Sequence, residues 1–90
     1  MIVIPTKKFN KRLENLERDA LTVARAEKAI AKLRKASSLH DVPNVETIEG
    51  SPGYYRLRFG DYRIGFRLVD ENTVILLSIG HRSVFYRSFP

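Results

Sequence analysis

The sequence predicts an α+β fold in which an N-terminal strand and a helical hairpin precede a three-stranded antiparallel meander. Two amphipathic stretches with helical spacing of apolar residues occupy the first 36 residues. Alternating apolar and polar residues follow from residue 54 to residue 80, and two polar turns interrupt them. We expect the helices to cover the apolar face of the sheet. A chain of 90 residues has room for one modest core, so residues 1–90 are interpreted as a single domain.

The first expected elements are a short strand and two helices. Residues 1–4 are apolar and Pro5 ends the run, which is typical of a short strand. Thr6 can cap a helix that begins at Lys7. Both helical stretches carry apolar residues on one face, namely Phe9, Leu13, Leu16, Val23, Ala26, Ile30 and Leu33. The stretches meet at residues 19–22, so we expect a helical hairpin.

The second half of the chain is expected to form strands. Residues 37–53 are interpreted as a long connection that ends in glycine and proline turn residues. Three strands are expected after it, at about residues 54–59, 61–69 and 73–80.

The first hairpin is predicted to turn at Gly60 and Asp61, a pair typical of two-residue hairpin loops. In that register Arg58 lies opposite Arg63, with Arg56 beside them. The apolar pairs on the other face are Phe59–Tyr62, Leu57–Ile64 and Tyr55–Phe66. Like charges directly opposite one another destabilise a hairpin, so we expect a protein that keeps this cluster to hold an anion with it.

The second turn is predicted to have Glu71 and Asn72 as its central residues. The apolar pairs in this register are Leu68–Ile75, Phe66–Leu77 and Ile64–Ile79. The pairs on the opposite face are Arg63–Gly80, Gly65–Ser78 and Arg67–Leu76. Because Gly65, Ser78 and Gly80 are small, the register predicts a shallow trough on that face. The cations expected beside the trough are Arg56, Arg58, Arg63 and Arg82.

Composition narrows the class of partner. Sixteen Lys and Arg against ten Asp and Glu give a formal charge of +6, and the pI is near 10.0. A pI above about 9 is typical of nucleic-acid-binding domains, although acidic proteins and membrane surfaces attract such a chain as well. Cysteine is absent, which excludes disulfides and thiolate chemistry. The sequence has no signal peptide and no apolar run of about 18 residues, so we expect a cytoplasmic protein without a membrane partner.

The arginine cluster has two interpretations. It is either a solvated sheet face or a phosphate site, and the scarcity of acidic residues on that face favours the phosphate site. Guanidinium groups bind phosphate as planar forks and stay charged, so they can stabilise the extra negative charge of a transition state.

Other chemical candidates lie outside the hairpin. His81 can transfer protons near neutral pH, but strand alternation places it on the covered face near Tyr62, where a packed histidine is an equal alternative. Tyr86 can donate a proton, stack on a base or simply pack. Glu46 is interpreted as either a base or a solvated loop residue. His40 with its neighbouring aspartate offers too few ligands for a metal, so no metal or cofactor is expected.

The run from Gly53 to Ile64, then Ser78 to Arg82 and the closing Tyr86, resembles the RelE/ParE toxin superfamily over nearly the whole chain. The resemblance implies a toxin of a type II toxin–antitoxin pair. From charge complementarity with this basic chain, we expect the antitoxin to be acidic and partly disordered. RelE-like members cut mRNA in the ribosomal A site without a metal. They use the RNA's own 2′-hydroxyl as nucleophile and leave a 2′,3′-cyclic phosphate.

The resemblance also implies roles for individual residues. The implied ligands of the scissile phosphate are Arg58, Arg63 and Arg82. Arg56 is implied to bind RNA, His81 or Tyr86 to transfer protons, and Glu46 is the nearest match to a base. We also expect Arg67, which lies on the arginine face of the same strand as Arg63, to bind RNA. Family members often carry lysines where this chain has Arg56 and Arg58. Arginine keeps the positive charge but hardly deprotonates, which disfavours proton abstraction by either residue. Two alternatives stay open, namely a ParE-like toxin that binds DNA gyrase and a module that binds RNA or protein without cutting it.

Overall fold

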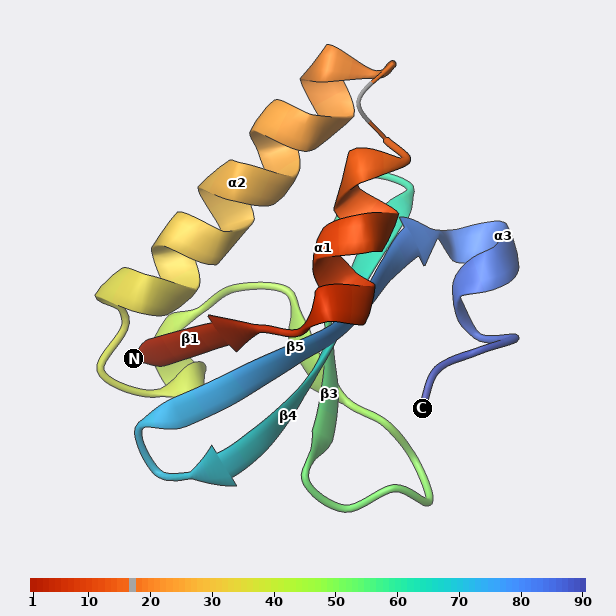
Figure 1. The fold of residues 1–90 in the computed structure, drawn as a ribbon. Coiled ribbons are helices and arrows are strands. Elements are labelled where there is room, and N and C mark those ends of the chain that lie inside the picture. Colours follow the sequence, from red (N-terminus) through yellow and green to blue (C-terminus); the bar gives the residue numbers. More distant parts are fainter. Residues whose placement is uncertain (17) are drawn as a thin grey trace.

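A computed structural model describes residues 1–16 and 18–90, and it confirms the expected α+β architecture (Figure 1). Among these residues five strands form one sheet in the order β1-β5-β4-β3-β2. The parallel pair is β1 with β5, and the other neighbouring strands are antiparallel. The elements are β1 (Ile2–Pro5), α1 (Lys7–Glu14), α2 (Ala20–Lys35), a 3₁₀ helix (Leu39–Asp41), β2 (Val45–Thr47), β3 (Tyr54–Phe59), β4 (Tyr62–Asp70), β5 (Thr73–His81) and α3 (Arg82–Phe85).

The predicted helical hairpin is present and covers one face of the sheet (Figure 1). Thr6 caps α1 as expected, because its Oγ1 accepts a hydrogen bond from the Phe9 backbone N–H at 3.1 Å. The same hydroxyl donates to the Leu76 carbonyl at 2.8 Å, which fixes the start of α1 to β5. Phe9 and Leu33 bring the apolar faces of the two helices into the core, where both are buried. Across the described residues, neither helix has the length and hydropathy that a membrane span needs.

Asp19 caps α2, and its Oδ1 accepts a hydrogen bond from the Thr22 backbone N–H at 3.1 Å. The Thr22 hydroxyl donates to the other carboxylate oxygen, and these bonds to Thr22 hold the pKa of Asp19 below its ordinary value. A folded-state pKa below the unfolded one stabilises the protein at higher pH, and this contribution disappears as the pH falls through the folded-state pKa. We therefore expect D19A to lower the urea midpoint slightly at neutral pH, and the difference from wild type to shrink below about pH 4. An equal difference at both pH values would contradict this assignment.

The register of the first hairpin is as predicted. Arg58 lies opposite Arg63, and the expected apolar pairs Phe59–Tyr62, Leu57–Ile64 and Tyr55–Phe66 are all present. Gly60 has a φ of 57°, which suits the first central position of a type II′ turn and favours glycine there. The two strands therefore place their arginines on one face and their apolar side chains against the helices.

The predicted register of β4 with β5 is correct at both ends and wrong in the middle. Asp70 pairs with Thr73 and Gly65 with Ser78, as expected, but Phe66 pairs with Leu76 rather than with Leu77. Likewise Leu68 pairs with Val74, and Arg67 with Ile75. Two irregularities cause the shift, because Val69 is an extra residue in β4 and Leu77 an extra residue in β5. The two insertions compensate, so the pairing near the arginines is unaffected.

The long connection contains a strand that the sequence did not predict. Val45–Thr47 form β2, which pairs with β3 so that Glu46 lies opposite Arg56. Asn44 precedes it with a φ of 66°, and its carbonyl accepts a hydrogen bond from the Arg58 N–H at 3.0 Å. Glu46 is therefore held on a strand beside the arginines and is not a loop residue.

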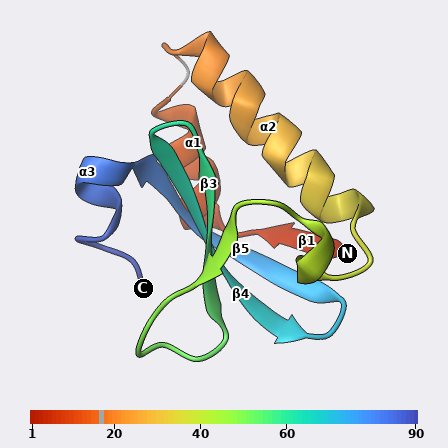
Figure 2. The same ribbon diagram turned by 180° about the vertical axis from the view of Figure 1, so that it is seen from behind.

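The prediction of an open trough is wrong for most of its length. The C-terminal helix α3 and the tail after it follow β5 and lie at the end of the sheet far from the β4–β5 turn (Figure 2). The Phe89 ring lies so close to Gly65 that an added Cβ atom would be 2.7 Å from it. Phe85 and Ser78 are buried as well, so the small residues accommodate an aromatic cover. An added Cβ at Gly80 meets no heavy atom within 4 Å, so the trough stays open there.

Candidate functional site

Four arginines meet at the end of the sheet that carries the β3–β4 turn. Arg56 and Arg58 alternate along β3, and Arg63 lies directly opposite Arg58 on β4. Arg82 joins them from the start of α3, because its backbone N–H donates to the Asp61 carbonyl at 2.7 Å. Side chains two residues apart on a strand share a face, so the three strand arginines project from the same side of the sheet.

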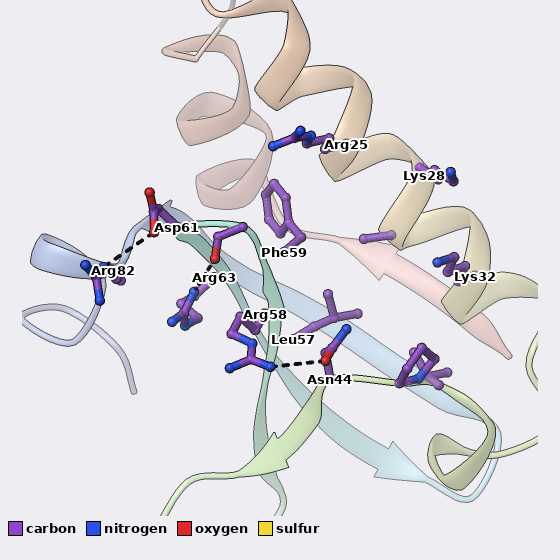
Figure 3. A pocket seen from close by; sticks show the side chains of 14 residues that line it. Arg25, Lys28, Lys32, Asn44, Leu57, Arg58, Phe59, Asp61, Arg63 and Arg82 are labelled. Atoms are coloured by element: carbon purple, nitrogen blue, oxygen red, sulfur yellow. Dashed lines mark hydrogen bonds and ion pairs between the residues drawn. The ribbon is translucent and has the colours of Figure 1, made fainter.

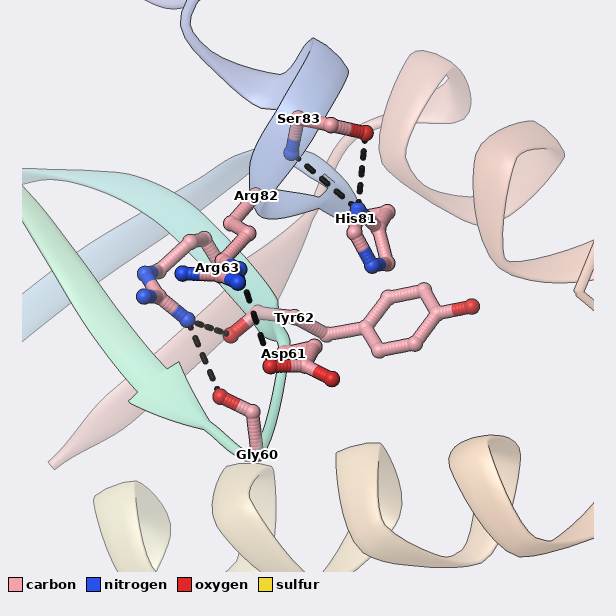
Figure 4. Close-up of polar contacts among 7 residues, drawn as sticks. All are labelled: Gly60, Asp61, Tyr62, Arg63, His81, Arg82 and Ser83. Carbon is pink, nitrogen blue, oxygen red and sulfur yellow. Dashed lines mark hydrogen bonds and ion pairs between the residues drawn. The ribbon is translucent and has the colours of Figure 1, made fainter.

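Arg58 and Arg63 have neutral hydrogen-bond partners. Arg63 Nη1 donates to the carbonyls of Gly60 at 3.1 Å and Tyr62 at 2.9 Å, which fixes its guanidinium beside the turn (Figure 4). Arg58 Nη2 donates to the Asn44 Oδ1 at 3.3 Å. Within residues 1–16 and 18–90, no carboxylate lies within ion-pair distance of either guanidinium. Their charges are therefore available to an anion.

Arg56 and Arg82 each have a carboxylate partner. Arg56 Nη2 lies 3.1 Å from the Glu46 Oε2, and Arg82 Nε lies 3.6 Å from the Asp61 Oδ1. The Arg82 and Asp61 side chains are 63% and 69% exposed, and ion pairs at such positions contribute about 0–1 kcal/mol. An incoming phosphate can therefore displace Asp61 from Arg82 at little cost.

Tyr86 lies against this cluster. The Arg56 Cζ is 5.7 Å from the centre of the Tyr86 ring, so the tyrosine, Arg56 and Glu46 form a continuous group. Phe85 is the last residue of α3 and is buried. Its ring contacts the Tyr86 ring edge-on, with the ring centres 4.9 Å apart. The C-terminal segment returns over the arginines because β5 continues through Gly80 and the chain turns at His81.

His81 lies on the other face of the sheet. Its ring contacts Tyr62 edge-on at 5.4 Å, in the pairing that strand alternation predicted. Its Nδ1 accepts a hydrogen bond from the Ser83 backbone N–H at 3.1 Å and lies 2.8 Å from the Ser83 Oγ, so it caps α3. Figure 4 shows the His81 ring on the side of Tyr62, away from the Arg63 guanidinium.

Arg67 is separated from the other arginines. It follows Arg63 by four residues on β4, and Phe89 covers the intervening Gly65. Its guanidinium instead lies over the Tyr54 ring, 5.6 Å from the ring centre. The structure thus brings Arg56, Arg58, Arg63 and Arg82 together and leaves Arg67 at a distance.

Three cations on α2 extend the site, and the sequence analysis did not assign them to it. Arg25, Lys28 and Lys32 line a groove of about 570 Å³ that lies between α2 and the β3–β4 turn (Figure 3). Arg58, Arg63 and Arg82 line the same groove. The helix cations recur at i, i+3 and i+7, which places them on one face. That spacing was readable from the sequence, but only the tertiary fold shows that this face borders the hairpin.

Comparisons with known proteins point to toxins of the RelE/ParE superfamily. Residues 3–85 match the family described as the ParE toxin of the type II toxin–antitoxin system parDE. Toxin RelE3 of Methanocaldococcus jannaschii is 37% identical over 62 residues, which cover 68% of this chain and 69% of that protein.

Solved structures are similar over almost the full length. The RelB–RelE antitoxin–toxin complex from Methanococcus jannaschii contains a chain with a TM-score of 0.78 and 29% identity, and the match covers 97% of this chain and 99% of that one. The RelBE2 toxin–antitoxin complex from Mycobacterium tuberculosis gives a TM-score of 0.68 at 25% identity, with 91% of each chain covered.

Proposed function

This chain belongs to the ParE toxin family and is a RelE-like toxin of a type II toxin–antitoxin system, and from this we propose that it is an mRNA endoribonuclease acting on translating ribosomes. The observation that supports the proposal most strongly is the pair Arg58 and Arg63, which lie opposite each other without a carboxylate partner among the described residues. Two guanidinium groups with only neutral hydrogen-bond partners, held opposite each other on paired strands, suit one phosphodiester group.

The proposed reaction is a transesterification within the RNA. The 2′-oxygen forms a bond to the neighbouring phosphorus, and the bond from phosphorus to the 5′-oxygen of the next nucleotide breaks. The products are a 2′,3′-cyclic phosphate and a free 5′-hydroxyl. Arg58, Arg63 and Arg82 hold the non-bridging oxygens, whose negative charge grows as phosphorus becomes five-coordinate. Arg56 orients the RNA, and the role proposed for Arg67 is contact with a more distant part of the strand.

Two proton transfers accompany this reaction. A base removes the proton of the 2′-hydroxyl, and an acid supplies a proton to the leaving 5′-oxygen. Glu46 is the proposed base because its carboxylate lies beside Arg56 on the arginine face. Tyr86 and His81 are the candidate acids. The contact of Tyr86 with Arg56 favours the tyrosine, since His81 caps α3 on the other face.

Replacing the proposed base tests this assignment. We expect E46Q to lower the rate of mRNA cleavage on purified ribosomes by about 10²- to 10⁴-fold, because glutamine cannot accept the proton. The fold should persist, since Glu46 is exposed and its ion pair with Arg56 contributes little. The matched control is E49Q, which neutralises another exposed glutamate in the same connection. Equal rates for the two variants would exclude Glu46 as the base.

The second candidate function is inhibition of DNA gyrase. The family matched over residues 3–85 is named for ParE toxins, and His81 does not face the arginine cluster. Inducing the protein in cells and mapping both RNA ends and chromosome breaks separates the two functions. Rapid fragmentation of mRNA within reading frames supports the nuclease, whereas chromosome breaks without mRNA fragments support the gyrase inhibitor.

We propose an acidic, partly disordered antitoxin as the cognate partner. The two solved relatives above are described as toxin–antitoxin complexes, and this chain carries a formal charge of +6 that an acidic segment would neutralise. The second proposed partner is mRNA in the ribosomal A site, and from this partner we propose the cytoplasm as the location of the protein.

A further inference from the structure

The groove between α2 and the β3–β4 turn, called here the α2 groove, carries far more positive than negative charge. Its cationic residues are Arg25, Lys28, Lys32, Arg58, Arg63 and Arg82. The carboxylate among its lining residues is Asp61, which is paired with Arg82. The three helix cations are exposed and line the groove from α2, and Arg25 extends toward the hairpin (Figure 3). A groove with cations on both walls suits a polyanion.

The helix cations are continuous with the proposed scissile-phosphate site. A Cβ atom added at Gly60 would lie 3.6 Å from the Arg25 Nη1, so the Arg25 guanidinium lies beside the turn. The carbonyl of the same glycine accepts the hydrogen bond from Arg63. Arg25 and Arg63 therefore approach one turn residue from the helix and from the sheet. From Arg25, the row of cations continues along α2 for about 10 Å to Lys32, at a rise of 1.5 Å per residue.

An apolar floor separates the two cationic walls. Leu57, Phe59, Val42 and Pro43 line the groove together with the cations. Phe59 is half-buried and stacks on Tyr62 with ring centres 5.8 Å apart, and it lies below Arg25 in Figure 3. Aromatic side chains between cations are typical of surfaces that bind single-stranded nucleic acid, because bases stack on the rings while phosphates contact the cations.

We propose that the α2 groove binds the RNA strand next to the scissile phosphate, with Arg25, Lys28 and Lys32 on neighbouring phosphates and a base against Phe59. This inference rests on the proposed function, since it extends the same strand beyond the site of cleavage. An acidic peptide that adds a strand to β3 fits less well. The Arg58 N–H at this edge already donates to the Asn44 carbonyl at 3.0 Å, so that backbone donor is occupied.

The experiment compares two triple variants that remove the same charge. R25Q/K28Q/K32Q neutralises the helix wall of the groove. K7Q/K8Q/K11Q neutralises three exposed lysines of α1 that do not line the groove. Glutamine has nearly the helix propensity of lysine and arginine, so both variants should fold. The probe is a labelled single-stranded oligouridylate, and its Kd is measured by fluorescence anisotropy over a series of salt concentrations.

We expect R25Q/K28Q/K32Q to reduce the steepness of the plot of log association constant against log salt concentration by about 2. Each lost phosphate contact on a single strand reduces this slope by about 0.7, and the variant removes three cations. The α1 variant should leave the slope nearly unchanged. On ribosomes, the groove variant should raise KM more than it lowers kcat, since its side chains bind substrate away from the reacting bonds.

Equal slopes for the two triple variants would overturn the inference. A groove variant that loses affinity for poly-L-glutamate but not for the oligouridylate would also overturn it, and would assign the groove to an acidic polypeptide. The binding assay requires no cleavage. If the wild-type protein proves inactive on ribosomes while the groove variant shows the flatter slope, the proposed function fails and the RNA-binding groove stands.

Discussion

Replacing Arg63 and Arg82 together with glutamine (R63Q/R82Q) is expected to slow mRNA cleavage on ribosomes by at least about 10³-fold and to abolish growth arrest. In the proposed reaction both guanidinium groups bind the phosphate oxygens that gain charge in the transition state. Glutamine keeps a hydrogen-bond donor but removes the charge, so the loss should appear mainly in kcat. The measurement is the single-turnover cleavage rate of an mRNA bound to purified ribosomes.

The structure indicates that R63Q/R82Q will still fold. The Arg82–Asp61 ion pair is exposed, and the Arg63 hydrogen bonds go to backbone carbonyls of the neighbouring turn. The control K7Q/K11Q removes the same charge from the exposed face of α1. Unfolding by urea should show similar midpoints for both variants. If R63Q/R82Q cleaves mRNA and arrests growth like the control, the arginines do not act on the phosphate.

Truncating Leu76 to alanine should destabilise the protein by about 2–5 kcal/mol, whereas L77A should cost no more than about 1 kcal/mol. The extra residue in β5 turns Leu76 into the core, where it is 0% exposed and paired with Phe66. Leu77 lies on the other face and is only partly buried. L76A therefore leaves a cavity between the sheet and the helices, while L77A loses limited contacts.

Urea denaturation of the two variants measures this difference directly. The side chains are identical and adjacent, so chain position and composition are matched. A regular strand without the two insertions would pair Phe66 with Leu77 and reverse the ranking. A larger loss for L77A than for L76A would show that the regular register is correct.

The helical hairpin and the first hairpin were predictable because local signals agree with the tertiary fold. Thr6 caps α1 as its position indicates, and the glycine at position 60 adopts the positive φ that its turn requires. Alternation in residues 54–59 and 62–67 separates arginines from apolar residues without ambiguity. The arrangement of Arg56, Arg58 and Arg63 on one face follows from that alternation and from the turn.

The middle of β5 was not predictable from its own residues. Val74, Ile75, Leu76 and Leu77 are four consecutive apolar residues, so alternation does not show which of them face the core. The register of β5 also depends on its neighbours β4 and α1, which both pack against it, and α1 lies far away in the sequence. A strand as short as β2 also gives little periodic signal, so the sequence does not distinguish its three residues from a connection.

The small residues Gly65 and Ser78 predict an open trough only if nothing else occupies the space above them. A small residue leaves space either for solvent or for a neighbouring side chain. Here Phe89 fills that space, and the tail that carries it is 24 residues beyond Gly65 in the chain. The sequence also could not assign the α2 cations to the site. Only the packing of α2 on the sheet shows that Arg25, Lys28 and Lys32 line a groove with the hairpin arginines.

The most direct test of the central claim is to identify the chemical ends of mRNA after the wild-type protein has acted on purified, translating ribosomes. Arginines gathered on one phosphate, with the neighbouring 2′-hydroxyl as nucleophile, predict breaks within the reading frame that leave a 2′,3′-cyclic phosphate and a 5′-hydroxyl. Intact mRNA, or fragments that end in a 3′-hydroxyl and a 5′-phosphate, would contradict the account.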